Sequence, residues 1–340
     1  MNNAIPRQPV IADVARIAGV SVSTVSRVLT GSVPVSEAKR SQVVAAITHL
    51  RYHPNATARA LVTGRRSMIG VITFNTTRFG YARTLQGIEE AARAAGYVVV
   101  IVVVESLEPA ELASAIGLVL GQAVAGVVVI EFDPVGLAVS KALPATLPVV
   151  VAGTAKSRRS PSPRAYLDDQ VGAAAATNYL LGLGHRTVHH LAIPQTSDRT
   201  GRALGWRAAL VAAGAPVPER IDADFDPISG YRAGRQLVED PAVTAILCGN
   251  DELAIGVMRA LVEAGRAVPG DVSVVGFDDQ PFAAMWAPSL TTVAQDFDDL
   301  GRRAFGLLEA QISTGRSART SAVSPRLVIR ESTAPARAQN

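Results

Sequence analysis

The segment VIADVARIAGVSVSTVSRVLTG, residues 10–31, decides the fold of the N-terminal part of this chain. Its first half has apolar residues at helical spacing, namely Ile11, Val14, Ala15 and Ala18. Gly19 then stands where a helix C-terminus requires a positive φ. Ser21 is a natural N-cap for a second short helix, whose apolar face is Val25, Val28 and Leu29. Two short helices joined by a glycine turn predict a helix-turn-helix.

The second helix of such a motif enters the DNA major groove and presents its early side chains to base edges. Val22, Ser23, Ser26 and Arg27 face away from the apolar stripe. Arg27 can donate bidentately to guanine, and Val22 can contact a thymine methyl group. Ser21 and Thr24 are better placed for phosphates. The alternative is that this polar face is merely solvated.

A third helix is expected from Glu37 to about Arg51, capped by Ser36, which we also count among the DNA-contacting candidates. Its predicted apolar stripe is Val43, Val44, Ile47 and Leu50. Tyr52 should complete a three-helix core.

The segment HPNATARALVTGRR, residues 53–66, predicts a hinge helix. Pro54 ends the third helix, and Asn55 can cap a short helix that is stable only when docked, because helix nucleation is costly. Leu61 is the apolar residue available to insert into a minor-groove step, with Ala58 and Arg59 beside it. A plain interdomain linker is the alternative, although it would not need such a helix-favouring composition.

Charge is distributed unevenly along the 340 residues. Residues 1–66 hold nine basic and two acidic residues, a net charge of 9 − 2 = +7, and the remainder holds 24 and 27, or −3. A basic N-terminal part is typical of binding to the phosphate backbone. The single cysteine, Cys248, excludes an internal disulfide framework and fits a reducing compartment. We find no signal-peptide pattern and no membrane-length apolar run, so we expect a soluble, cytoplasmic protein without a membrane partner.

From Met68 onward, short apolar runs alternate with amphipathic segments. The candidate strands are Ile69–Thr73, Val98–Val103, Gly126–Ile130, Val149–Ala152, Val188–Ala192, Ala245–Cys248 and Val272–Gly276, and we expect the runs 97–104 and 126–130 to be buried. The stretches 85–95 and 252–264 indicate helices that end at Gly96 and Gly265. This alternation predicts an α/β fold of doubly wound parallel sheets, with ligands bound at the carboxyl ends of the strands.

An ordered series of motifs resembles the lactose-repressor (LacI/GalR) family of bacterial transcription factors. It comprises IADVARIAGVSVSTVSRVLTG, YHPNATARAL, GHRTVHHLAIP, RALGWRAAL, ILCGNDELAIGVMRAL, VPGDVSVVGFDD, PSLTTVAQDF and RLVIREST, and runs from residue 9 to residue 334. The resemblance implies a DNA-binding headpiece over residues 9–54, a hinge helix and linker over 55–67, and a two-lobed core like that of periplasmic sugar-binding proteins over 68–334. It further implies homodimers on palindromic operators, controlled by a small effector, usually a sugar.

Several polar residues follow predicted strands and should face a cleft. Arg, carboxylate and amide groups suit a polyhydroxylated ligand, and aromatic rings suit the face of a sugar. The resemblance points to Arg202, Asn250, Asp278 and Gln295 or Phe297. The full set of effector-binding candidates is Phe79, Tyr81, Glu131, Arg202, Trp286, Asn250, Asp278, Gln295 and Phe297. Asp251 and Asp279 can alternatively cap the helices after them, which we expect for Asp251, and Trp206 is expected to lie in the core. The loop Arg78-Phe79-Gly80-Tyr81 departs from the family's common Asn-Pro-Phe-Phe, which leaves the ligand open.

Other functions find little support. We expect no cofactor and no metal, because His185, His189 and His190 lack suitable partners and the acidic residues 222–226 lack the terminal Glu of a calcium loop. An enzyme would need a nucleophile or cofactor motif, and a transport-type binding protein would have no use for residues 9–66. The prediction is therefore a non-enzymatic transcriptional regulator, most simply a repressor of carbohydrate uptake or catabolism genes, with either induction or corepression open.

Overall fold

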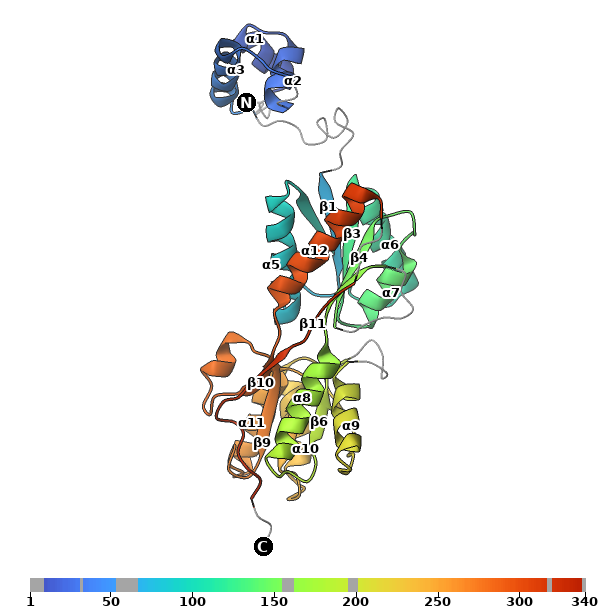
Figure 1. Cartoon of the computed structure of the whole chain (residues 1–340), viewed down its shortest axis with the longest axis vertical. Coiled ribbons are helices and arrows are strands. Elements are labelled where there is room, and N and C mark those ends of the chain that lie inside the picture. Colours follow the sequence, from blue (N-terminus) through green and yellow to red (C-terminus); the bar gives the residue numbers. More distant parts are fainter. Residues whose placement is uncertain are drawn as a thin grey trace, which may run out of the picture. The chain divides into compact units, whose positions relative to one another are not determined.

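The computed structural model describes residues 9–30, 33–52, 67–154, 162–194, 201–316 and 320–337. The chain divides into two compact units, residues 1–67 and 68–340, which are taken separately below. Figure 1 labels most of their helices and strands.

The first unit contains three helices, α1 (Ile11–Ala18), α2 (Val22–Thr30) and α3 (Glu37–Leu50). Their core combines Val14, Ala15, Ala18, Val25, Val43, Ala46 and Tyr52. Gly19 ends α1 with φ of 64°, and the Ser21 hydroxyl accepts a hydrogen bond from the Thr24 amide at 3.2 Å at the start of α2. The expected glycine turn and serine cap are both present, as is the closing contact of Tyr52.

Two details of the third helix were predicted wrongly. Val44 is 52% exposed, whereas Ala46 is buried. The inward stripe follows the spacing of Val43, Ala46 and Leu50, and each residue advances a helix by about 100°, so that Val44 falls outside the stripe. Ser36 occupies the N-cap position of α3, but its side chain makes no capping hydrogen bond.

The second unit consists of two α/β lobes, each built on a six-stranded sheet. Lobe 1 has the strand order β11-β5-β4-β3-β1-β2. Its strands are β1 (Met68–Thr73), β2 (Val98–Val103), β3 (Val124–Glu131), β4 (Val149–Gly153), β5 (Arg164–Leu167) and β11 (Ser321–Val323), all parallel. Helices α5 (Phe79–Ala94) and α12 (Phe297–Thr314) pack on one face, and α6 (Pro109–Leu120) and α7 (Pro134–Ala142) pack on the other (Figure 1).

Lobe 2 has the strand order β12-β10-β9-β8-β6-β7, parallel except where β12 pairs antiparallel with β10. Its strands are β6 (His189–Ala192), β7 (Ile221–Asp222), β8 (Ala245–Cys248), β9 (Ser273–Asp278), β10 (Thr291–Ala294) and β12 (Arg326–Val328). Helices α8 (Asp169–Gly182) and α9 (Arg202–Ala212) cover one face, and α10 (Pro227–Leu237) and α11 (Asp251–Glu263) cover the other. A 3₁₀ turn, η1 (Pro281–Ala284), follows β9.

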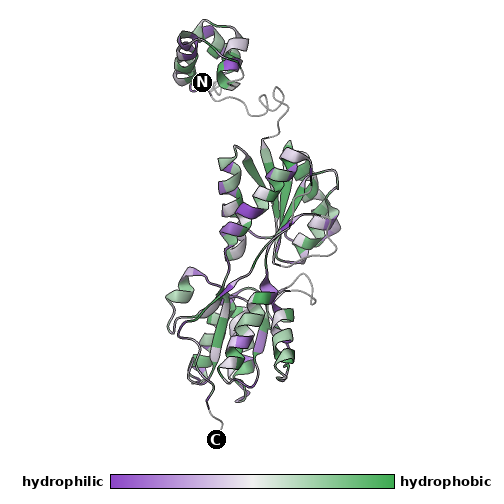
Figure 2. Cartoon of the chain, in the orientation of Figure 1, coloured by the Kyte–Doolittle hydropathy of each residue, from purple (hydrophilic) through white to green (hydrophobic). Residues whose placement is uncertain are grey.

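Within the described residues the chain passes between the lobes three times: from β5 to α8, from β10 to α12, and from β11 to β12. The predicted two-lobed fold of doubly wound sheets is therefore confirmed. Figure 2 shows apolar residues concentrated along the central strands of both sheets, as expected for parallel strands covered on two faces.

The run 97–104 was expected to be buried, and this prediction is wrong for most of its length. β2 is the edge strand of the lobe 1 sheet, and Val98, Ile101 and Val103 are 59%, 47% and 41% exposed. The prediction missed β5, β7, β10, β11 and β12, which have two to four residues and lack the continuous apolar run that identified the equally short β8. No helix in the described parts of the chain is long and apolar enough to cross a membrane.

Candidate functional site

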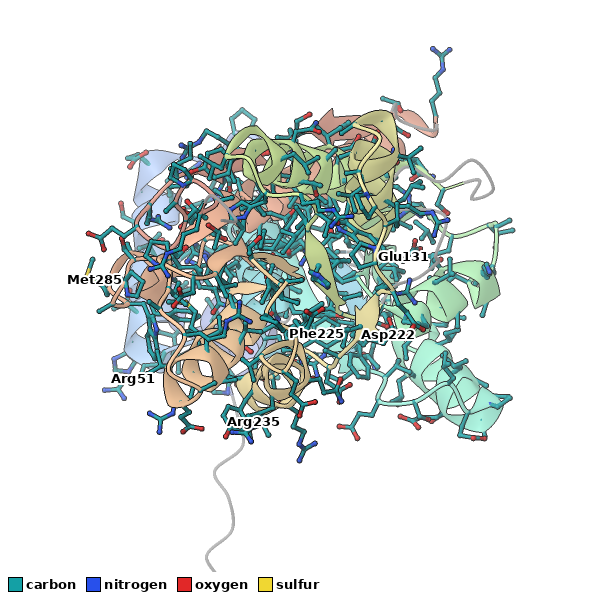
Figure 3. All side chains as sticks on the ribbon, turned by 90° about the horizontal axis from the view of Figure 1, so that it is seen from below. Arg51, Glu131, Asp222, Phe225, Arg235 and Met285 are labelled. Carbon is teal, nitrogen blue, oxygen red and sulfur yellow. The ribbon has the colours of Figure 1, made fainter. Side chains whose placement is uncertain are left out.

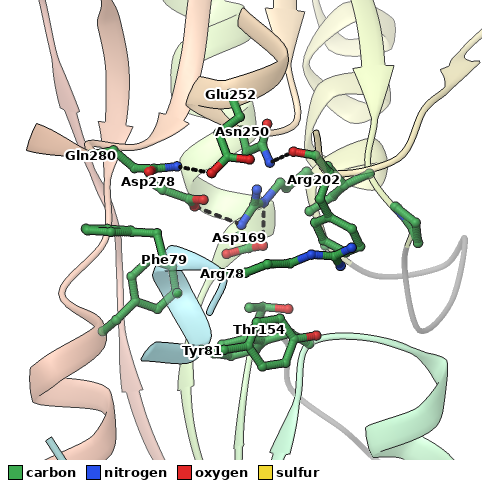
Figure 4. A pocket seen from close by; sticks show the side chains of 17 residues that line it. Arg78, Phe79, Tyr81, Thr154, Asp169, Arg202, Asn250, Glu252, Asp278 and Gln280 are labelled. Carbon is green, nitrogen blue, oxygen red and sulfur yellow. Dashed lines mark hydrogen bonds and ion pairs between the residues drawn. The ribbon is translucent and has the colours of Figure 1, made fainter. Parts of the chain in front are cut away.

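A pocket lies between the two lobes of the second unit, at the carboxyl ends of their parallel strands (Figure 4). Lobe 1 contributes Arg78, Phe79, Tyr81, Phe132 and Thr154, and lobe 2 contributes Asp169, Arg202, Phe225, Asn250, Glu252, Asp278 and Gln280. The cavity measures about 60 Å³, room for a few water molecules. A larger ligand therefore requires the lobes or their side chains to move.

Arg202, at the start of α9, is the central charged group of lobe 2. Its Nε donates to Asp169 Oδ2 at 2.7 Å, its Nη2 donates to Asp278 Oδ1 at 3.2 Å, and its Nη1 donates to the Gly249 carbonyl. The guanidinium also lies 4.0 Å from the centre of the Phe277 ring. Burial raises the pKa of Asp169 to about 6, although Arg202 opposes that shift. Asp169 Oδ1 is buried and has no hydrogen-bond partner among the described residues.

Asp278 ends β9 in an unusual backbone conformation, with φ of 104°. Residues other than glycine rarely adopt this backbone conformation, so contacts with neighbouring groups must hold Asp278 in it. Arg202 and Gln295 both donate to Asp278 Oδ1, at 3.2 and 3.0 Å. These bonds aim the carboxylate into the pocket.

Asn250 lines the pocket, but both ends of its amide are engaged in the fold. Its Oδ1 accepts from the Leu253 amide at 2.7 Å, which caps α11, and its Nδ2 donates to the Phe225 carbonyl at 2.9 Å. The expected capping role of Asp251 is therefore wrong. Asp251 accepts from the Gln280 amide and from the Thr292 hydroxyl, and its burial raises its pKa well above the usual range.

The lobe 1 wall of the pocket is aromatic. The Phe79 and Phe297 rings meet edge to face at 6.0 Å, and Phe132 contacts both Phe297 and Tyr81 in the same way. The Tyr81 hydroxyl donates to the buried Asp133 carboxylate, and burial raises the pKa of Tyr81. Tyr81 therefore offers a ligand the face of its ring, because its hydroxyl is already committed to Asp133.

Three residues predicted to bind an effector lie elsewhere. Glu131 is buried in an ion pair with Arg164 Nη1 at 2.9 Å and accepts from the Ser140 hydroxyl. Gln295 lines a second cavity beside the interlobe crossings and reaches the first pocket only through Asp278. Trp286 is 42% exposed and follows η1 on the surface of lobe 2.

The structure adds pocket residues that the prediction did not include. Asp169 follows β5, which was itself missed, and Phe225 follows the two-residue strand β7. Glu252 was assigned only to a helix. Arg78 was noted as a departure from the family pattern but not as a site residue; Figure 4 shows its side chain reaching across the pocket.

The first unit presents the predicted DNA-contacting face on α2. Ser21, Val22, Ser23 and Arg27 are exposed, as is Ser36 before α3, while Thr24 and Ser26 are half-buried. Ser21 Oγ lies 2.8 Å from Ser23 Oγ and 2.9 Å from Thr24 Oγ1, so these hydroxyls form a small polar cluster at the start of α2. The hinge candidates Asn55, Ala58, Arg59 and Leu61 lie outside the described residues.

The remaining candidates have structural roles. Trp206 is buried and donates from Nε1 to the Val188 carbonyl at 2.7 Å, and Cys248 is buried in β8. His190 faces the core and contacts Trp206, while His189 points to the other face of β6. Among the residues that the structure describes, no group of three or more His, Cys, Asp or Glu side chains could hold a metal ion.

Comparisons with known proteins agree with this architecture. Residues 10–55 match the model of bacterial regulatory proteins of the lacI family, and residues 177–333 match a periplasmic binding protein-like domain. The chain is 33% identical over 333 residues to the HTH-type transcriptional repressor PurR of Pectobacterium carotovorum subsp. carotovorum (strain PC1), covering 95% of this chain and 96% of that protein.

Solved structures show the same likeness over nearly the whole chain. The lac repressor dimer bound to operator and the anti-inducer ONPF matches with a TM-score of 0.88 and 30% identity, over 96% of this chain and all of that one. The transcriptional regulator CelR in complex with cellobiose matches with a TM-score of 0.69 and 30% identity, over 95% and 99% of the two chains.

Proposed function

Because the chain belongs to the LacI family of DNA-binding transcriptional regulators and is not an enzyme, we propose that it is a ligand-responsive repressor of carbohydrate uptake or catabolism genes. In this proposal, a homodimer binds a palindromic operator through its N-terminal units. A sugar or sugar derivative binds between the lobes and changes operator affinity. The observation that carries the proposal is the Asp169–Arg202–Asp278 cluster, which lines the lobe 2 side of an interlobe pocket in a chain that also has a helix-turn-helix.

The exposed face of α2 supports DNA binding. Arg27 reads guanine, Val22 contacts a thymine methyl group, and the hydroxyls near Ser21 bind phosphates. Nine basic residues in the first 66 positions supply the attraction to the phosphate backbone.

The proposed hinge rests on the sequence alone. Leu61 from each subunit would insert at the centre of the operator, and Leu61→Ala should then weaken specific binding. An unchanged affinity for the operator in that variant would remove the hinge from the proposal.

Exposed apolar side chains support a homodimer. On lobe 1, Val98, Ile101 and Val103 lie on the edge strand β2. On lobe 2, Met285 is 81% exposed beside Trp286, and Met285 lies at the margin of the molecule in Figure 3. Exposed apolar side chains that gather on one surface are typical of a protein interface, and Ile101 and Val103 point to the same face of β2. The related lac repressor was solved as a dimer.

The polar and aromatic character of the pocket supports a small polar effector. Arg202, Asp169 and Asp278 can exchange hydrogen bonds with hydroxyl groups, and the Phe79 and Phe225 rings offer apolar surfaces. The related CelR was solved with a sugar, cellobiose. A cavity of about 60 Å³ is too small for a sugar ring, so binding requires the lobes or their side chains to move, and in this proposal that movement is coupled to operator binding. That coupling links effector and operator affinity reciprocally.

The test is fluorescence anisotropy of the full-length protein on its own upstream promoter DNA, over a range of salt concentrations and with a panel of metabolites. We expect specific binding that weakens steeply with salt and responds to one effector class. Arg27→Ala should reduce sequence preference, whereas Arg16→Ala, an exposed arginine on α1, should change only the electrostatic attraction. Arg202→Met should abolish the effector response. Absence of specific DNA binding in the wild type would contradict the proposal.

A further inference from the structure

Of the residues that the structure describes, two arginines line the interlobe pocket, and they differ in how their charge is compensated. Arg202 is held by two carboxylates and a carbonyl. For Arg78, no carboxylate lies within ion-pair distance among the described residues, and its Nη1 is buried without a hydrogen-bond partner. A buried guanidinium nitrogen without an acceptor is costly, so a ligand that supplies an acceptor there gains affinity.

The backbone positions Arg78 before any ligand arrives. Asn75 Oδ1 accepts from the Thr77 and Arg78 amides, both at 2.8 Å, and so fixes the turn that leads into α5. The Arg78 guanidinium lies 4.0 Å from the centre of the Phe225 ring and 5.6 Å from that of Phe74. Stacking on aromatic rings uses the flat faces of a guanidinium and leaves its N–H edges for a planar or tetrahedral oxyanion.

The start of α5 adds a second feature that favours negative charge. Arg78 is the N-cap residue of α5, its side chain makes no capping hydrogen bond, and the first turn contains no acidic residue. The first amides of a helix have no partner within the helix and carry the positive end of its dipole. Phe79, Gly80 and Tyr81 of this turn all line the pocket.

The carboxylates of the pocket do not cancel this preference. Asp169 and Asp278 are both engaged by Arg202. Glu252 is half-buried; burial raises its pKa and the Arg78 charge opposes that shift, but Glu252 forms no ion pair with Arg78 and instead accepts from Gln280 Nε2 at 3.4 Å. Within the part of the chain that the structure describes, Asp169 Oδ1 is a buried acceptor without a partner, which suits a hydroxyl or amine donor on the same ligand.

We propose that the effector is an acidic metabolite whose compact oxyanion, a carboxylate or a phosphate, is bound by Arg78 and the first turn of α5, while a hydroxyl or amine group meets Asp169. This inference rests on the proposed effector site and narrows the effector from sugars in general to sugar acids or sugar phosphates. Arg78 belongs to lobe 1 and Phe225 to lobe 2, so the Arg78 guanidinium connects the two lobes by stacking on Phe225. The bound oxyanion would contact this same guanidinium.

The test measures thermal stabilisation of the full-length protein by inorganic phosphate, gluconate and glucose 6-phosphate, each against glucose or chloride at equal ionic strength. We expect at least one oxyanion to raise the unfolding temperature and glucose to leave it unchanged. Stabilisation by gluconate would indicate recognition of a carboxylate, and stabilisation by glucose 6-phosphate would indicate recognition of a phosphate. Arg78→Met should weaken that binding at least tenfold, and Arg78→Lys should weaken it less. Arg93→Met, an exposed arginine at the other end of α5, should bind as the wild type does.

Two results would overturn the inference: no stabilisation of the wild type by any of the three oxyanions, or equal stabilisation of Arg78→Met. The headpiece arginines are the same in both proteins, so their binding of phosphate cancels in the comparison. Unfolding midpoints without ligand show whether each variant is folded. If a neutral sugar changes operator binding and Arg78→Met leaves that response intact, the proposed function stands and only the acidic class is wrong. If no small molecule changes binding to the operator, and Arg202→Met also leaves operator binding unchanged, the proposed effector site itself is wrong.

Discussion

Arg202 and Asp169 form a buried ion pair, with Arg202 Nε 2.7 Å from Asp169 Oδ2, between the first residues of α9 and α8. Asp278 shares the same guanidinium. Three ionisable groups in one buried cluster make the pocket sensitive both to substitution and to pH.

Removing the arginine alone should be strongly destabilising. Arg202→Met leaves two buried carboxylates without a counter-charge, which costs about 3–5 kcal/mol of unfolding free energy. Adding Asp169→Asn to Arg202→Met should recover part of the lost free energy of unfolding, because it removes one of the two buried carboxylates that have no counter-charge. Urea denaturation of the single and double variants measures the coupling. Strictly additive losses would show that the pair does not act as a unit.

The elevated pKa of Asp169 predicts an acid-side gain in stability. Burial raises that pKa from 3.8 to about 6, so the native state holds the proton more tightly than the unfolded chain does. The free energy of unfolding should therefore fall as the pH rises from about 4 to about 6, by about 3 kcal/mol for a shift of about two pKa units. At pH 7 the loss is complete.

His190 acts in the opposite direction, since burial lowers its pKa to about 4 and its protonation destabilises the fold as the pH falls below about 6.5. The informative quantity is therefore the difference between wild type and Asp169→Asn. Urea denaturation at intervals from pH 4.5 to pH 7.5 should give a difference that depends on pH. Parallel curves would exclude Asp169 as the titrating group.

Two glycines of α12 should respond in opposite ways to alanine. A Cβ at Gly301 would stand 2.3 Å from the Thr84 carbonyl oxygen of α5, whereas a Cβ at Gly306 meets nothing within 4 Å. Gly301→Ala should destabilise by about 1–3 kcal/mol through overpacking. Gly306→Ala should stabilise by about 0.5–1 kcal/mol, because alanine favours a helix. Thermal unfolding of the two variants provides the comparison, and equal effects would show that α5 and α12 do not pack this closely.

Dimerisation through the edge of lobe 1 should be sensitive to charge. Ile101→Asp places a carboxylate on the exposed apolar row of β2 and should convert dimers to monomers in sedimentation experiments. Val211→Asp, at a 61% exposed position on α9, is the control and should remain dimeric. An undisturbed dimer in Ile101→Asp would place the interface elsewhere.

Neighbouring valines of α3 should differ in their contribution to the first unit. Val43 is fully buried and Val44 is 52% exposed. Val43→Ala should cost about 2 kcal/mol for two methyl groups removed from a packed core, and Val44→Ala should cost little. Hydrogen exchange of residues 9–52 in the full chain reports on this unit directly, since both tryptophans lie in the second unit. Faster exchange in Val44→Ala than in Val43→Ala would contradict the observed stripe.

Much of the architecture could be predicted from local patterns. The helix periodicity around Val14 and Val25, the glycine at position 19 and the alternation of apolar strands with helices depend on neighbours along the chain. A strand as short as β7, with two residues, has no apolar run or alternation by which it could be recognised. The edge position of β2 was also hidden, because a run of valines has the same composition at the centre of a sheet and at its edge.

The sequence by itself determined the family, the helix-turn-helix and the two-lobed α/β class, because helix and strand patterns repeat over short distances and the motifs occur in a fixed order. Only the tertiary structure decided which polar residues meet in the pocket. Asp169, Arg202 and Asp278 are brought together from three separate segments by the packing of α8 and α9 on the lobe 2 sheet, while Glu131 is held away by Arg164. That Arg78 Nη1 has no hydrogen-bond partner among the described residues is likewise visible only in the tertiary structure, since a missing partner leaves no trace in the order of residues.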